Sequence, residues 1–304
     1  MRKVKRTGDK ARKVVTMENP RDLERRDAGS ESTFGDGRSA WLGRLGNVRN
    51  VVRQEMISRQ LDKHLRMPSA RVLDVGAGQG TQSIRLARAG HQVLAVEPDP
   101  AMRSIFLAAL AAEPVEVQDR VTLCQGSVGS LGAVTGGEVY DAVLLLGVLM
   151  YLQASAPVIA EVAAHVAPGG LLAMAARTTT SAVWRPAARQ DWQATLAAFD
   201  EHDSALAVGR GMQYINELGA LARADDLETL TSAAAAYGLE LENWYGVRIA
   251  VDPEELDPAP PSDPRDLAAL LDAEERLGAS DPYRQLGQLA HLILRRTPSA
   301  AAGE

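Results

Sequence analysis

One stretch decides the fold of this chain: Arg71-Val72-Leu73-Asp74-Val75-Gly76-Ala77-Gly78-Gln79-Gly80. A short apolar run ends at an aspartate, and three glycines follow at alternate positions. Apolar residues at helical spacing come next, beginning with Ile84. The pattern predicts a buried parallel strand, a tight turn and a helix N-terminus whose free N–H groups face a ligand. The glycines allow positive φ and let a ligand lie against the backbone.

The glycine spacing differs from that of dinucleotide-binding proteins. Their fingerprint, G-x-G-x-x-G, places its third glycine where this chain has Thr81. Asp74, before the first glycine, also suits a cationic ligand better than a pyrophosphate. The run Val93-Leu94-Ala95-Val96-Glu97-Pro98 follows at the right distance to be a second strand. It ends in a carboxylate, Glu97, that is placed to accept hydrogen bonds from both hydroxyls of a ribose.

These features together resemble motifs I and II of the class I S-adenosylmethionine-dependent methyltransferases. The resemblance implies an α/β fold: a seven-stranded, doubly wound, Rossmann-like methyltransferase sheet. It also implies an N-terminal helical lid and an insertion between strands five and six. S-adenosyl-L-methionine is the implied cofactor, and the motif residues expected to bind it are Asp74, Gly76, Ala77, Gly78, Gly80, Glu97 and Pro98.

Strands and helices alternate along the cofactor half of the chain. Strands are expected at 71–75, 92–96, 121–125, 140–147 and 170–176, with helices at 80–89, 99–112 and 155–167 between them. A helix at 227–237, a strand at 239–251 and a final strand at 291–294 follow. Such alternation predicts a parallel sheet covered on both faces, with ligands at the carboxyl ends of its strands. Asp74, Glu97, Ser127 and Gly147 all fall at such ends.

Composition places the chain among ordinary globular proteins. It has 304 residues, of which 46% are hydrophobic and 24% charged. A single cysteine, Cys124, excludes an internal disulfide and a cysteine-built metal site. The longest apolar stretch, 142–149, is too short to span a bilayer, and the basic N-terminus has no apolar run behind it. We therefore expect a cytoplasmic enzyme with no membrane or metal partner.

The chain divides into one domain and two tails. Residues 1–40 read as a mobile, basic and polar tail, either simply solvated or acting as a nucleic-acid arm, and Met17 is an alternative start. Residues 41–297 form the methyltransferase domain, and 298–304 are expected to fray. Within the domain, a helix from Trp41 to Leu65 is the expected lid. The insertion, about 178–226, should roof the acceptor pocket, with most of its aromatic residues in a small satellite core.

Three further segments resemble the bacterial tRNA 5-carboxymethoxyuridine methyltransferases. They are Gly46-Asn47-Val48-Arg49, Gly246-Val247-Arg248-Ile249, and Asp281-Pro282-Tyr283 followed by Leu286-Gly287 and His291. This resemblance implies that Arg49, Gly76, Ala77, Glu97, Val128, Gly129 and Gly147 surround the cofactor. Arg49 would reach the methionine carboxylate, and Ser127 or the Val128 backbone would accept from the adenine amino group. The chain departs from the family at Gly147, where a histidine is expected.

The acceptor is left open by the residues. The first hypothesis is methyl transfer to an oxygen or nitrogen of a small molecule or carboxylate. The alternative is carboxyl methylation of a tRNA wobble uridine. A net charge of −6 and an acidic segment 181–304 disfavour a phosphate backbone, although Arg177, Arg185, Arg189 and Arg210 oppose that trend. A hypothesis of another class is a non-catalytic protein of the same fold that only binds the cofactor.

Few side chains suggest themselves for chemistry. Transfer from a sulfonium needs alignment and exclusion of water more than proton transfer. Tyr151 and Arg248 are the candidates for contacting the acceptor. His64 and His91 are expected to be structural or solvent-facing, so no catalytic residue is assigned.

Overall fold

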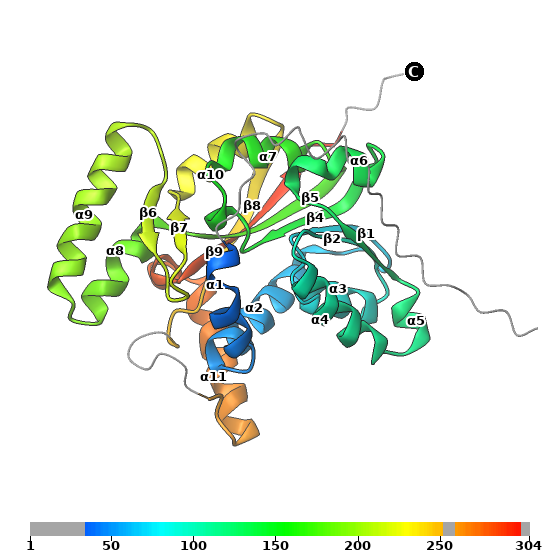
Figure 1. Ribbon diagram of the computed structural model, residues 1–304, viewed down its shortest axis with the longest axis horizontal. Helices are drawn as coiled ribbons and strands as arrows, with labels where there is room; N and C mark the ends of the chain where they lie inside the picture. The colour runs from blue at the N-terminus through cyan, green and yellow to red at the C-terminus, as the bar shows by residue number, and fades with distance from the viewer. Residues whose placement is uncertain (1–33, 252–258, 299–304) are drawn as a thin grey trace, which may run out of the picture.

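The computed structural model describes residues 34–251 and 259–298, which form one seven-stranded sheet with helices on both faces (Figure 1). The expected tails, apart from residues 34–40 and residue 298, lie outside the described residues. The strand order is β3-β2-β1-β4-β5-β9-β8. Strands β1 to β5 are parallel, and β9 runs antiparallel to β5 and β8. The strands are β1 Arg71–Val75, β2 Gln92–Glu97, β3 Val121–Gln125, β4 Tyr140–Leu146, β5 Val166–Arg177, β8 Leu239–Val247 and β9 Leu289–Arg296. The predicted fold class is confirmed.

Two groups of helices cover the sheet. The helices α2 Val48–His64, α3 Thr81–Arg88 and α4 Pro100–Ala111 pack on one face, while α6 Leu131–Thr135, α7 Ser155–Ala163 and α10 Leu227–Ala235 pack on the other. Alternate strand residues explain this sandwich. In β5, Leu171 and Ala173 join the first group, and Leu172 and Met174 join the second. Successive side chains of each strand therefore pack into the hydrophobic cores on opposite faces of the sheet.

The expected single N-terminal helix is two helices, α1 Phe34–Gly43 and α2. Asn47 begins α2, because its side-chain oxygen accepts the Asn50 N–H at 2.8 Å and so caps the helix. Helix α1 begins at Phe34, inside the segment expected to be a tail through residue 40. Phe34 packs edge-on against Tyr151, with ring centroids 5.3 Å apart, and this tertiary contact was not visible in the sequence.

The insertion after β5 lies where it was predicted, between the fifth and sixth strands of the sheet by chain order. It consists of α8 Thr179–Ala188, α9 Trp192–Ala207, β6 Met212–Ile215 and β7 Leu221–Ala224. Its interior is built from small residues, chiefly Ala182, Ala198, Ala205, Met212 and Ala224. The expectation of an aromatic satellite core is wrong for Trp184, Trp192 and Phe199, which are all exposed. Alanines let α8, α9 and the β6–β7 hairpin approach closely, leaving the large rings outside.

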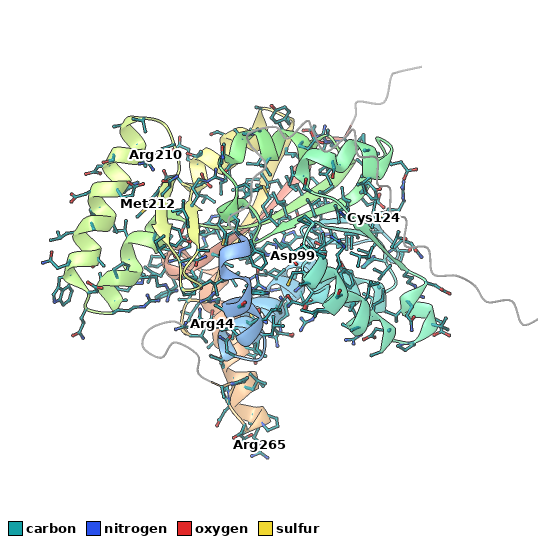
Figure 2. All side chains as sticks on the ribbon, viewed as in Figure 1. Arg44, Asp99, Cys124, Arg210, Met212 and Arg265 are labelled. Carbon is teal, nitrogen blue, oxygen red and sulfur yellow. The ribbon has the colours of Figure 1, made fainter. Side chains whose placement is uncertain are left out.

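The remaining helices, α5 Val115–Gln118 and α11 Pro264–Ala279, flank the sheet. Helix α11 packs on α2 through Leu271, Val52 and Met56, which clamps α2 in place. Cys124 lies in β3, far in the view of Figure 2 from Arg210 and Met212 of the insertion. Partial burial raises the pKa of its thiol, which fits a packing residue rather than a nucleophile. Among the described residues, no helix is long and apolar enough to cross a bilayer.

Candidate active site

The carboxyl ends of β1, β2, β4 and β5 line one pocket beneath α1. It encloses about 1240 Å³ when the solvent at its open mouth is counted. Asp74, Glu97, Gly147 and Arg177 line it from four different strands or strand ends. The pleat explains the convergence, because Asp74, Glu97 and Arg177 continue the rows of side chains that face α2, α3 and α4.

The glycine turn between β1 and α3 forms one wall. Gly76 and Ala77 donate their N–H groups to the Val96 carbonyl, at 2.8 and 3.2 Å, which folds the turn over β2. Gly78 lines the pocket at φ +58°, and a Cβ there would meet only the Met102 methyl group, at 3.5 Å. Space on this side of the turn is thus open to a ligand.

Gly80 has a different role from the expected one. It does not line the pocket, although it is left-handed with φ +82°. A Cβ on Gly80 would lie 2.2 Å from the ring of Phe106, a fully buried residue of α4. The third glycine is therefore required by helix packing, which sequence spacing could not separate from ligand contact.

Glu97 lies at the end of β2, 5% exposed, and lines the pocket with Pro98. One carboxylate oxygen accepts the Gly78 N–H and the other accepts the Asp99 N–H, both at 2.8 Å. Burial raises the pKa of Glu97, and these two N–H donors oppose the shift. The glycine turn thus fixes the orientation of the carboxylate that the sequence assigned to a ribose.

Asp74 lies deeper, at the end of β1. The Ser83 hydroxyl donates to its carboxylate at 2.6 Å. Burial raises the pKa of Asp74 to about 6, the Ser83 hydrogen bond opposes the rise, and the nearby charge of Glu97 adds to it. Two buried carboxylates therefore face the same pocket, which favours a ligand with positive charge or several donors.

Arg53 of α2 lines the pocket, whereas Arg49, expected to do so, is buried outside its lining. The Arg53 guanidinium lies 4.5 Å from the Trp41 ring centroid and donates to the Asn50 side chain at 3.1 Å. Burial, followed by the charge of Arg248, lowers its pKa to about 10. A Cβ on Gly147 would lie 3.3 Å from its Nη1 atom, so the missing histidine side chain would meet this guanidinium. The expected helix therefore contributes an arginine to the pocket lining, but it is Arg53, one helical turn after Arg49.

Tyr151 and Arg248 both line the pocket, beside the turn of the β6–β7 hairpin. The Tyr151 hydroxyl accepts from the Asn216 side-chain amide at 3.4 Å, and burial raises its pKa. Arg248, held at φ +63°, approaches Glu217 with an Nη1–Oε1 distance of 3.4 Å. These residues form the pocket wall beside the insertion.

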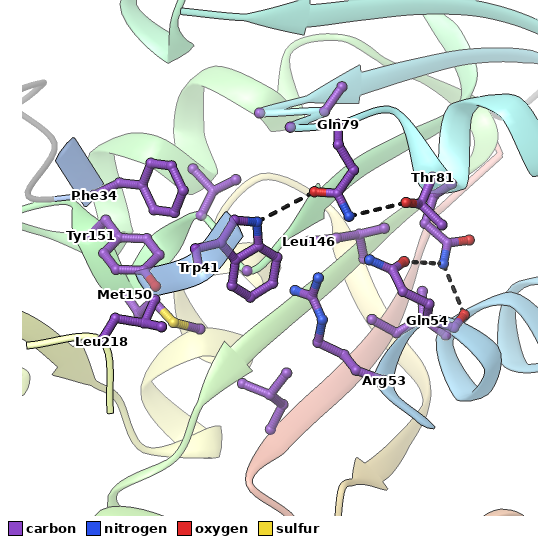
Figure 3. A pocket seen from close by; sticks show the side chains of 18 of the residues that line it. Phe34, Trp41, Arg53, Gln54, Gln79, Thr81, Leu146, Met150, Tyr151 and Leu218 are labelled. Atoms are coloured by element: carbon purple, nitrogen blue, oxygen red, sulfur yellow. Dashed lines mark hydrogen bonds between the residues drawn. The ribbon is translucent and has the colours of Figure 1, made fainter. Parts of the chain in front are cut away.

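Helix α1 contributes Phe34 and Trp41 to one side of the pocket, where Trp41 lies between Gln79 and Arg53 (Figure 3). Trp41 donates from Nε1 to the Gln79 side chain at 3.4 Å, and Phe34 packs on Tyr151. Arg44 donates to the Glu217 carbonyl. The lid therefore joins the glycine turn to the insertion. Trp41 lay at the start of the predicted lid helix, but no local signal marked it as a site residue.

Several expected residues lie outside the pocket lining. Ser127, Val128 and Gly129 follow β3 at the same edge of the sheet, where the Ser127 N–H donates a capping hydrogen bond to the Ser130 hydroxyl oxygen at 2.8 Å. Both histidines are structural: His91 accepts the Ala70 N–H at 3.0 Å, and His64 bridges Glu242 and Tyr245. No histidine lines the pocket within the described ranges.

Comparisons with known proteins agree with this geometry. A methyltransferase domain family matches residues 73–174. A ubiquinone biosynthesis O-methyltransferase from Methylocella silvestris is 30% identical over 222 residues, covering 60% of this chain and 84% of the relative. Another from Xanthomonas axonopodis pv. citri is 33% identical over 135 residues, covering 44% of this chain and 53% of the relative.

Solved structures share the fold at lower identity. A 1,6-didemethyltoxoflavin-N1-methyltransferase from Burkholderia thailandensis, with bound S-adenosylhomocysteine, matches with a TM-score of 0.51 and 19% identity. The match covers 87% of this chain and 84% of that one. A glycopeptide N-methyltransferase matches with a TM-score of 0.50 and 15% identity, over 80% of this chain and 89% of that one.

Proposed function

Because the chain belongs to the class I S-adenosylmethionine-dependent methyltransferases, we propose that it methylates an oxygen of a small-molecule acceptor. The observation that carries this proposal is the single pocket running from Glu97 under α1 to Tyr151 and Arg248. Its lining joins the glycine turn, where a cofactor would lie, to residues of the insertion on the far side, and α1 covers part of it. The O-methyltransferase relatives support oxygen as the receiving atom.

The residues of the pocket fit S-adenosylmethionine. Glu97 would accept from the ribose hydroxyls, with the backbone of Gly76, Ala77 and Gly78 against the nucleoside. Asp74 would face the positively charged part of the cofactor. Arg53, whose buried Nε has no hydrogen-bond partner among the described residues, would hold the methionine carboxylate in place of Arg49. The adenine would extend toward Pro98, with Ser127, Val128 and Gly129 at its polar edge.

The bound cofactor supplies an electrophilic methyl group on a sulfonium, and the neutral thioether that leaves needs no proton. The chain has to align the acceptor and keep water out, and alignment alone is worth several kcal/mol. The lid contacts of Trp41 and Phe34 exclude water. Tyr151 stays a neutral hydrogen-bond donor, because burial raises its pKa, so it orients an acceptor rather than deprotonating it. An acceptor that is already an oxyanion requires no base.

A second candidate is the tRNA wobble-uridine carboxyl group. One observation favours it: Arg248, in the segment that resembles the tRNA 5-carboxymethoxyuridine methyltransferases, lines the pocket. Against it stand the net charge of −6 and the lid contacts that narrow the entrance. A uridine would have to enter past α1.

Labelled methyl transfer separates the two candidates. The full chain is incubated with S-adenosylmethionine carrying a tritiated methyl group, a small-molecule cell extract and, separately, total tRNA. We expect label in small-molecule products, separated from S-adenosylmethionine by chromatography, and none in RNA, and Glu97→Ala should lower the signal at limiting cofactor. Label in tRNA alone would favour the second candidate, and label in neither fraction would contradict both.

A further inference from the structure

Arg177, the last residue of β5, is the least compensated charge in the pocket. It is 7% exposed and lines the pocket on the side of the insertion. Its guanidinium makes no hydrogen bond or ion pair with any described residue, and its Nε is buried without a partner. Within the described part of the chain, its guanidinium lies over the Tyr214 ring, whose centroid is 5.0 Å from Cζ. The buried guanidinium of Arg177 is thus held in the pocket by its contact with the Tyr214 ring and by packing, with no negatively charged partner among the described residues.

The other pocket arginines differ in this respect. Arg248 approaches Glu217, and Arg53 has both Asn50 and the Trp41 face. A buried charge without a partner costs several kcal/mol, and a desolvated cation–π contact returns about 2 kcal/mol, which offsets part of that cost. Arg177 therefore carries an energetic cost that a negatively charged ligand would offset.

A second polar group lines the same part of the pocket and requires a hydrogen-bond donor on the ligand. Gln288, adjacent to the residue that pairs with Arg177 across β5 and β9, is 2% exposed and lines the pocket. Its Oε1 atom is also buried without a hydrogen-bond partner. An amide beside a guanidinium can bind a carboxyl or phosphate group that carries a donor nearby.

We propose that Arg177, with Gln288 and Tyr214, forms an anion subsite that selects acceptors bearing a carboxylate or phosphate group. The subsite rests on the methyltransferase function proposed above and determines its substrate class. It is distinct from the place of the cofactor's own carboxylate. Arg53 contacts the lid residue that bonds to the glycine turn, whereas Arg177 contacts Tyr214 of the insertion and accepts the Asp225 N–H through its carbonyl.

The test uses the full chain saturated with S-adenosylhomocysteine and three probes: benzoate, phenyl phosphate and the neutral isostere benzamide. Calorimetry measures the binding of each probe to the wild type, Arg177→Gln and Arg177→Lys. Arg189→Gln is the matched control, since it removes the same charge from the exposed end of α8. The ratio of S-adenosylhomocysteine to 5′-methylthioadenosine affinity is measured in parallel, because only the former has a carboxylate.

We expect the wild type and Arg189→Gln to bind one of the two anions about tenfold tighter than benzamide. Comparing the affinities of benzoate and phenyl phosphate then identifies whether the subsite prefers a carboxylate or a phosphate group. Arg177→Gln should lose the preference, Arg177→Lys should keep part of it, and neither should change the cofactor ratio. Because an uncompensated charge is removed, Arg177→Gln should melt no lower than the wild type.

Three results would overturn the proposal. The first is a wild type with no preference for either anion. The second is a cofactor ratio that collapses in Arg177→Gln, which would assign Arg177 to the cofactor. The third is an Arg177→Gln variant that unfolds or melts well below the wild type, since Arg177 would then be a structural residue. Failure of the wild type to bind S-adenosylhomocysteine would instead contradict the proposed function itself.

Discussion

Glu97 connects the glycine turn to the proposed ribose contact. Since two N–H groups already orient its carboxylate, Glu97→Ala should weaken S-adenosylmethionine binding by about 1–3 kcal/mol. Calorimetry gives the dissociation constant, and Glu116→Ala, an exposed carboxylate on α5, is the control. An unchanged affinity in a folded Glu97→Ala protein would remove Glu97 from the site.

Asp74 gives the unliganded protein a pH-dependent stability. Its pKa is about 6 in the folded protein against the ordinary 3.8. Between these values the folded state keeps a proton that the unfolded chain has lost, so the free energy of unfolding falls as pH rises through this window. The loss approaches roughly 3 kcal/mol above pH 6 or so.

Asp74→Asn should lack this loss, because the amide oxygen can still accept from Ser83 but does not titrate. Urea unfolding measures the free energy of unfolding of both proteins between about pH 4 and pH 7. The value for the variant, relative to that of the wild type, should rise by up to roughly 3 kcal/mol across this range. A constant difference across this range would mean that Asp74 is not buried as a carboxylate.

At the scale of elements, the turn between β1 and α3 contains glycines with separate tasks. Gly78→Ala should lower the free energy of unfolding by about 1–2 kcal/mol, because alanine disfavours the left-handed backbone at this position. It should also block cofactor binding, since its Cβ enters the pocket. Gly80→Ala should add about 1–3 kcal/mol of overpacking against Phe106 to the same backbone cost. Unfolding and binding measurements on both variants check this ordering, and the reverse order would contradict it.

Helix α1 should contribute to affinity as a lid. Trp41→Ala removes the ring under the Arg53 guanidinium and the bond to Gln79, so binding of S-adenosylhomocysteine should weaken by about 1–2 kcal/mol. The matched control is Trp192→Ala on α9, whose ring is 62% exposed and far from the pocket lining. Equal affinities of the two variants would show that α1 does not cover the bound cofactor.

At the scale of the whole molecule, charge separates the two proposed acceptors. If tRNA binds through its phosphates, the logarithm of its affinity should fall by roughly 0.9 per duplex phosphate neutralised for each unit of log salt. With a net charge of −6, we expect weak tRNA binding at physiological salt. Filter binding across a salt series measures the slope. Tight, steeply salt-dependent binding, with methylation of a wobble uridine, would reverse this preference.

The sequence by itself determined the strand, turn and helix around Asp74 to Gly80, and it placed Glu97 at the end of the next strand. These features are local, because side-chain period and glycine positions act over a few residues. The order of alternating elements then predicted the sheet, which the structure confirms. It also predicted a ligand site at the carboxyl edge of that sheet, where the pocket lies.

Only the tertiary structure decided which distant residues meet at that edge. The roles of Gly80 beside Phe106 and of Arg53 instead of Arg49 depend on how helices pack on the sheet. The sequence placed Arg177 at the end of a predicted strand. Its contact with the Tyr214 ring, and the lack of a hydrogen-bond partner for its Nε among the described residues, depend on the fold of the insertion. Contacts between segments far apart in the chain follow from tertiary packing, and the local sequence pattern does not predict them.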